Sequence, residues 1–193
     1  MPLNIPILLT WLRVALIPLM VGVFYLPENW MPNTDRGLIS AVIFIVAAVT
    51  DWFDGFLARR WNQTSAFGAF LDPVADKLIV AGALLVLVEF YDLNSLIAFI
   101  IIGREITISA LREWMAQLGA SKSVAVSSIG KIKTAAQMIA IPLMLYDAQL
   151  FGMETFWPGV LLLIVAAVLT VWSMFYYLRK AWPLIKATSG HLE

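Results

Sequence analysis

The chain has 193 residues, of which 61% are hydrophobic and 13% charged, and its formal net charge is zero. This apolar fraction exceeds the roughly 45 to 50% of a soluble globular domain, so the sequence predicts an integral membrane protein. A neutral chain without a Lys/Arg run gives no indication of a nucleic-acid partner. With no cysteine and one histidine, His191, its chemistry is left to carboxylates, cations, hydroxyls and the backbone.

Membrane-spanning helices are predicted wherever about 20 mainly apolar residues follow one another. The first segment lacks the basic start and cleavage site of a removable signal peptide. Charges interrupt several of the others, and turn or polar residues separate them. We expect one all-α domain over residues 1–193, an integral membrane bundle of six transmembrane helices at 5–26, 37–60, 73–91, 95–117, 124–146 and 156–178. Residues 181–193 are expected to form a cytoplasmic tail that can be part tag.

The distribution of basic residues predicts the orientation, because Lys and Arg accumulate on the cytoplasmic side of membrane proteins. With both termini inside, the outer loops carry Arg36 as their only basic residue. This N-in, C-in arrangement brings most of the intramembrane charges toward the cytoplasmic ends of their helices. A polar active site is therefore expected at the cytoplasmic side, built from Asp51, Asp54, Asp76, Arg112, Lys131 and Lys133.

Four aspartates interrupt the second and third predicted helices. Asp51 and Asp54 are three residues apart and therefore share one helix face. Asp72 precedes Pro73, which suits an N-cap followed by proline at the first helical position, and Asp76 lies one turn further on. The short connection between the helices allows the two aspartate pairs to face each other.

Ionised aspartates inside a membrane are costly and repel one another, so they need a compensating charge. Lys77, Arg59 and Arg60 can supply part of it. Oxygen-only ligands are those that hard divalent cations take, and a pair of such ions is a known device for phosphoryl chemistry. Two alternatives stay open: an interfacial salt-bridge network, and an ion or proton pathway in a transporter.

The spacing Asp51-x2-Asp54-Gly55-x2-Ala58-Arg59-x8-Gly68-x3-Asp72-x3-Asp76 resembles the signature of the class I CDP-alcohol phosphotransferases at every position. Members of that family are six-helix membrane enzymes that move a phosphatidyl-type group from a CDP-linked lipid to an alcohol and release CMP. The resemblance implies that the four aspartates hold two Mg²⁺ or Mn²⁺ ions, with Asp76 also the general base. It implies a nucleotide site formed by Asn4, Thr10, Gly55, Ala58, Arg59 and Gly68.

The acceptor site is expected among the cations outside this signature. Arg104 and Arg112 are two helical turns apart and lie roughly on one face, and Lys131 and Lys133 follow in the next helix. These cations indicate a phosphate-bearing acceptor, although they can also be side chains that reach the lipid headgroups. An acceptor such as inositol, inositol phosphate or a second lipid is the alternative within the family.

Further segments, "NIPILLTWLRV", "GREI", "SALREW" and "GKIKT", resemble the bacterial branch of the family whose acceptor is sn-glycerol 3-phosphate. This resemblance implies CDP-diacylglycerol as donor, phosphatidylglycerophosphate and CMP as products, and a role in anionic phospholipid synthesis. It places the acceptor phosphate against Arg104, Arg112, Lys131 and Lys133, and makes Arg13 a residue that lines the nucleotide side or braces the aspartates. It also implies a homodimer in the bacterial inner membrane.

Overall fold

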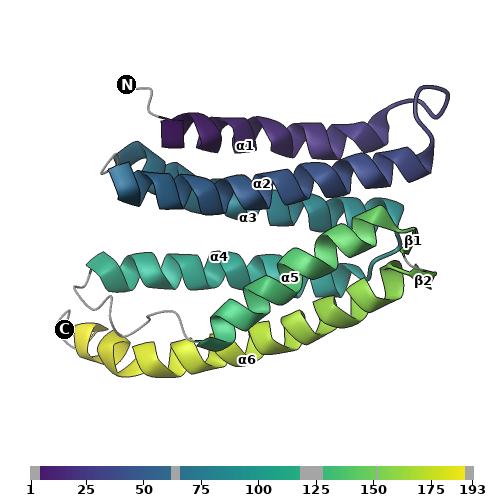
Figure 1. Cartoon of the computed structure of the whole chain (residues 1–193). Coiled ribbons are helices and arrows are strands. Elements are labelled where there is room, and N and C mark those ends of the chain that lie inside the picture. Colours follow the sequence, from purple (N-terminus) through teal and green to yellow (C-terminus); the bar gives the residue numbers. More distant parts are fainter. Residues whose placement is uncertain (1–4, 62–65, 118–127, 151, 190–193) are drawn as a thin grey trace.

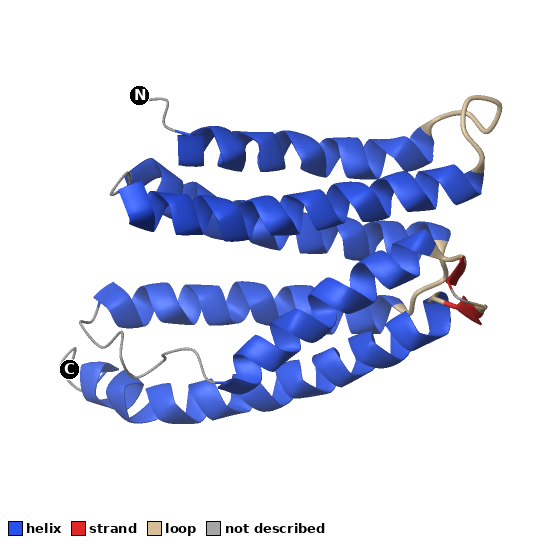
Figure 2. Cartoon of the chain, in the orientation of Figure 1, coloured by secondary structure: helices blue, strands red, loops and turns tan. Residues whose placement is uncertain are grey.

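The computed structural model describes residues 5–61, 66–117, 128–150 and 152–189, and it is almost entirely helical (Figures 1 and 2). A single turn of 3-10 helix, η1 (Val23–Tyr25), follows the first α-helix. A short antiparallel hairpin of two-residue strands, β1 (Gln149–Leu150) and β2 (Met153–Glu154), precedes the last α-helix. The α-helices of this described part are α1 (Ile5–Gly22), α2 (Asn33–Trp61), α3 (Ala66–Phe90), α4 (Ser95–Gln117), α5 (Ser128–Tyr146) and α6 (Phe156–Ser189).

Short polar residues set several helix boundaries. Asn94 caps α4, because its side-chain oxygen accepts a hydrogen bond from the backbone N–H of Leu96 at 2.9 Å. Asp92 lies two residues after the end of α3 and Asp147 directly follows α5, with φ angles of 54° and 38°. Aspartate tolerates this left-handed conformation better than most residues, so the chain can turn sharply there.

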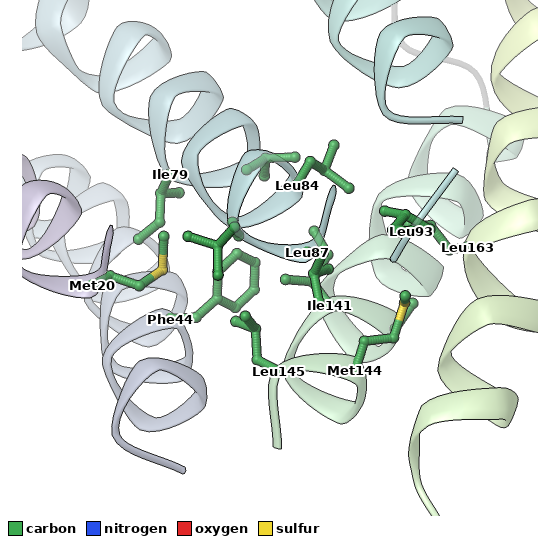
Figure 3. Close-up of a cluster of buried hydrophobic side chains, with 14 of the residues drawn as sticks. Met20, Phe44, Ile79, Leu84, Leu87, Leu93, Ile141, Met144, Leu145 and Leu163 are labelled. Atoms are coloured by element: carbon green, nitrogen blue, oxygen red, sulfur yellow. The ribbon is translucent and has the colours of Figure 1, made fainter. Parts of the chain in front are cut away.

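The bundle has two halves, with α1, α2 and α3 on one side and α4, α5 and α6 on the other (Figure 1). The start of α1 and the end of α6 lie at the same end of the bundle. Helix α5 crosses obliquely and packs on both α6 and α2, which joins the halves. The core between them contains Met20, Phe44, Leu87, Ile141 and Leu145, all at most 1% exposed (Figure 3).

Much of the outer surface is apolar. Phe99, Val168 and Trp172, for example, are 72%, 63% and 69% exposed. Exposing many large apolar side chains to water is unfavourable, so this surface suits a lipid environment. Within the described residues, three stretches are long and apolar enough to cross a membrane: Ile7–Tyr25, Asn33–Leu57 and Phe156–Tyr176. A shorter apolar stretch, Ile132–Tyr146, lies in α5. The predicted all-helical bundle with membrane-type helices is therefore found.

Several predicted helix boundaries were wrong, among them the start of α2, which is Asn33 and not residue 37. Asp72 does not cap a helix that starts at Pro73, because α3 begins at Ala66 and contains both residues. A proline at this position removes one hydrogen bond to the carbonyl four residues earlier, a loss that membrane-type helices tolerate when neighbouring groups compensate. Helix α6 also continues to Ser189, through most of the segment expected to be a tail.

Candidate active site

Arg13 stands at the centre of the aspartate cluster. Its side chain is 0% exposed, and its guanidinium pairs with Asp51 at 2.8 Å, with Asp76 at 2.7 Å and with Asp54. The planar guanidinium presents several donors in a fixed fork, so one arginine of α1 can hold carboxylates from α2 and α3 at once. The fold therefore brings the two predicted aspartate pairs face to face, as their spacing indicated.

The fourth aspartate is held from the same helix. The hydroxyl of Thr10 donates a hydrogen bond of 2.7 Å to Asp72, and Thr10 lies one turn before Arg13 in α1. Thr10 and Arg13 are 2% and 0% exposed, so the α1 side of both interactions is buried. The N-terminal helix thus positions the aspartates of the motif. Lys77, expected to compensate them, instead donates to the hydroxyl of Ser109 in α4 at 2.5 Å.

The chemistry of this donor set fits divalent metal ions. Four carboxylates from two facing helices offer the oxygen ligands that Mg²⁺ and Mn²⁺ prefer, and three already gather around one positive charge. Among the described side chains, Arg13 is the cation that pairs with these aspartates, and its single charge does not balance four carboxylates. Among the described residues, no three acidic or histidine side chains are arranged in ready-made metal coordination, because the carboxylates are turned toward the guanidinium.

A cavity of about 400 Å³ opens beside the cluster. Asp51 and Asp76, each about 40% exposed at the side chain, form one wall, and α4 and α5 form the other. The second wall is rich in cations and polar groups, among them Arg104, Glu105, Arg112 and Gln137. The cavity therefore joins a carboxylate side to a cationic side, as a site for two phosphate-bearing reactants requires.

Glu105 organises the cationic wall. It pairs with Lys133 and, at 3.2 Å, with Arg104, whose other nitrogen donates to the hydroxyl of Ser173 in α6 at 2.9 Å. Lys133 and Arg104 are 1% and 6% exposed. Two of the predicted phosphate ligands, Arg104 and Lys133, thus pair with a carboxylate, and a third, Arg112, lines the cavity two turns nearer the end of α4.

The predicted site residues fall into two groups. The described ones lie in the two charged groups of this site: Thr10, Asp51, Asp54, Asp72 and Asp76 in the cluster, Arg104 and Arg112 in the cationic wall, and Lys133 paired with Glu105 of that wall. Gly55 and Gly68 lie on α2 and α3, the two helices that carry the aspartates. Asn4 and the side chains of Ala58, Arg59 and Lys131 lie outside the described part of the structure.

Glu105, Ser173 and Gln137 received no role from the sequence. A signal was present for Gln137, which lies four residues after Lys133 and so shares its helix face. Nothing in the sequence links Ser173 to Arg104, which is 69 residues away.

An apolar helical bundle with a carboxylate cluster facing a cationic wall defines a membrane-type protein suited to phosphate-group chemistry. A family model described as CDP-alcohol phosphatidyltransferase matches residues 3–172, and the chain belongs to this family. Two similar proteins, from Salmonella choleraesuis (strain SC-B67) and Escherichia coli (strain K12), are each 56% identical over 183 residues. The match covers 94% of this chain and 96% of each relative, and both are named "CDP-diacylglycerol--glycerol-3-phosphate 3-phosphatidyltransferase".

Proposed function

We infer that this chain transfers the phosphatidyl group of CDP-diacylglycerol to sn-glycerol 3-phosphate, giving phosphatidylglycerophosphate and CMP. The observation that carries the inference is 56% identity along almost the whole length of enzymes with that name. The cavity agrees with it, because the carboxylate wall suits a metal-bound diphosphate and the cationic wall suits an acceptor phosphate. The enzyme serves the synthesis of anionic phospholipids.

The transfer replaces one phosphorus–oxygen bond by another. The 1-hydroxyl of glycerol 3-phosphate attacks the phosphorus that carries the diacylglycerol, and the bond from that phosphorus to CMP breaks. The electron pair of this bond leaves with CMP, and the proton of the attacking hydroxyl passes to a carboxylate. Asp76 is our candidate for this general base, since it belongs to the aspartate cluster, pairs with Arg13 and borders the cavity.

Asp51, Asp54, Asp72 and Asp76 are proposed to hold two Mg²⁺ or Mn²⁺ ions. When bound, such ions would offset charge on the diphosphate and on the departing CMP. We expect purified protein to lose turnover in EDTA and to recover it with Mg²⁺ or Mn²⁺. Full activity in the chelator would contradict the metal assignment.

For the acceptor phosphate we propose Arg112 as the direct contact, because it lines the cavity nearer the cytoplasmic end of α4 than the Glu105 network. Arg104 and Lys133 then contribute positive potential and shape, with Glu105 fixing both. Lys131 completes the predicted set. The nucleotide is proposed to contact Asn4, Thr10, Gly55, Ala58, Arg59 and Gly68.

The proposed orientation is N-in and C-in, in the bacterial inner membrane, with the cavity open to the cytoplasm. It rests on the basic residues of the inner loops and on the water-soluble acceptor and CMP, which need an aqueous path. Labelling of single cysteines introduced at exposed Arg60 and Gln149 should give opposite accessibilities from the two sides of the membrane. We also propose a homodimer, which native mass spectrometry in mild detergent would reveal by its mass.

The experiment that tests the activity measures CMP release from CDP-diacylglycerol with candidate acceptors. We expect release with glycerol 3-phosphate, and little with inositol or inositol phosphate. Release with another acceptor alone would assign the protein to a different branch of the family. A cation or proton-coupled transporter would instead give flux across sealed vesicles without CMP.

A further inference from the structure

Gln137 lies in the wall of the catalytic cavity and has no role in the reaction described above. It sits on α5 one helical turn after Lys133, so both side chains lie on the face of α5 that meets Glu105 of α4. Its side chain is 3% exposed, and its amide nitrogen has no hydrogen-bond partner within the described part of the chain. Gln137 is therefore a buried donor at the edge of a substrate cavity.

A buried amide without a partner needs a physical reason. Buried polar groups are nearly always hydrogen-bonded, because the bonds to water that burial removes must be replaced. Glutamine also costs side-chain entropy to fix, and an apolar residue of similar size would fill the same space. A glutamine in a cavity wall is thus best explained by a partner that enters the cavity.

The chemistry of Gln137 differs from that of the charged side chains around it. The amide is neutral and offers two N–H donors and a carbonyl acceptor, so it can both donate to and accept from one hydroxyl. The phosphate of the acceptor binds arginine more strongly, because a guanidinium carries a full positive charge and several hydrogen-bond donors. Gln137 therefore suits a neutral hydroxyl group of the substrate.

The arrangement of the cavity indicates which hydroxyl. Arg112 lies two turns closer to the C-terminal end of α4 than Arg104, and Gln137 lies one turn further from the N-terminal end of α5 than Lys133. In the proposed orientation these two helix ends face the cytoplasm, so Gln137 lies further from the cytoplasm than Lys133. A phosphate at Arg112 leaves the glycerol part to extend inward, where the 1-hydroxyl must meet the carboxylates opposite. The remaining 2-hydroxyl is then the neutral group that faces the α5 wall.

We propose that Gln137 hydrogen-bonds the 2-hydroxyl of sn-glycerol 3-phosphate and makes the enzyme selective for acceptors that carry this group. The proposal rests on the function inferred above and adds a specificity residue to it. Gln137 does not touch the reacting bonds, so it acts on acceptor choice. Loss of a hydroxyl from the substrate and loss of the amide from the protein should then remove the same interaction.

The test compares two acceptors in CMP release. One is sn-glycerol 3-phosphate, and the other is 3-hydroxypropyl phosphate, which keeps the phosphate and a terminal hydroxyl but lacks the 2-hydroxyl. In the wild type we expect kcat/KM to be about tenfold lower for the analogue, as for one lost hydrogen bond to a buried group. In Gln137→Met, kcat/KM for glycerol 3-phosphate should fall about tenfold and that for the analogue should hardly change.

Gln149→Met is the matched control, because it makes the same chemical change at an exposed hairpin position and should preserve the preference. Equal losses on both acceptors in Gln137→Met would overturn the proposal and assign the residue to packing, a structural water or the phosphate. A wild type without preference would overturn it even if the variant did not fold. A wild type that releases CMP with neither acceptor would instead refute the proposed function and this assignment with it.

Discussion

Replacing Arg13 by methionine is the most direct test of how the aspartate cluster is held together. Methionine keeps a long unbranched side chain and high helix propensity, so the substitution removes the guanidinium with little change in helix formation. In the wild type this buried group faces Asp51, Asp54 and Asp76. In Arg13→Met these carboxylates face one another without their counterion.

The expected effect follows from that geometry. Removing one partner of a buried ion pair costs about 3 to 5 kcal/mol, because the remaining charge stays poorly solvated. For a chain of this size each kcal/mol shifts the unfolding temperature by roughly 2 to 4 °C, so a decrease of about 6 to 20 °C is expected. The unfolding temperature of Arg13→Lys should fall between those of the wild type and Arg13→Met, since a lysine keeps the charge but loses the planar guanidinium that contacts several carboxylates.

The assay is thermal unfolding of detergent-solubilised protein, first in EDTA and then with Mg²⁺. The decrease should be largest in EDTA and partly reversed by Mg²⁺, because divalent cations can replace the lost positive charge. Arg60→Met, at an exposed position of α2, is the control and should shift the midpoint by no more than about 2 °C. An Arg13→Met protein as stable as the wild type in EDTA would refute the view that this guanidinium balances the cluster.

Two further predictions concern the acceptor wall and helix packing. Arg112→Ala should raise the KM for glycerol 3-phosphate about 10- to 100-fold, as for a lost charge-assisted contact. Lys133→Ala should raise this KM and also lower the unfolding temperature, because it removes a partner of Glu105. Unchanged KM values in both variants would show that the phosphate binds elsewhere. Gly37→Ala should cost about 1 to 3 kcal/mol, because the new methyl carbon would lie 2.4 Å from a backbone carbonyl of α5. Gly103→Ala, with open space at its Cβ, should be neutral or stabilising, and equal unfolding midpoints for the two variants would contradict the packing of α2 against α5.

Composition and helical periodicity are enough to predict a membrane-type helical bundle and to place two of the aspartates on one helix face. Apolar stretches of spanning length predict helices from their composition alone, and helical periodicity places Asp51 and Asp54 on one face without tertiary information. The start of α3 was misplaced because Asp72-Pro73 is typical of a helix start, whereas the structure engages Asp72 with Thr10 and carries the helix through the proline.

The partner of each buried charge depends on how the helices pack. Arg13 lies 63 residues from Asp76, and Arg104 lies 69 residues from Ser173, so no local pattern links either pair. Packing of α1 against α2 and α3 makes Arg13, rather than Lys77, the counterion of the aspartates among the described side chains. Residue types and local spacing thus define the chemistry available to this chain, while the helix packing selects the partners, because burial makes each unpaired charge too costly to leave alone.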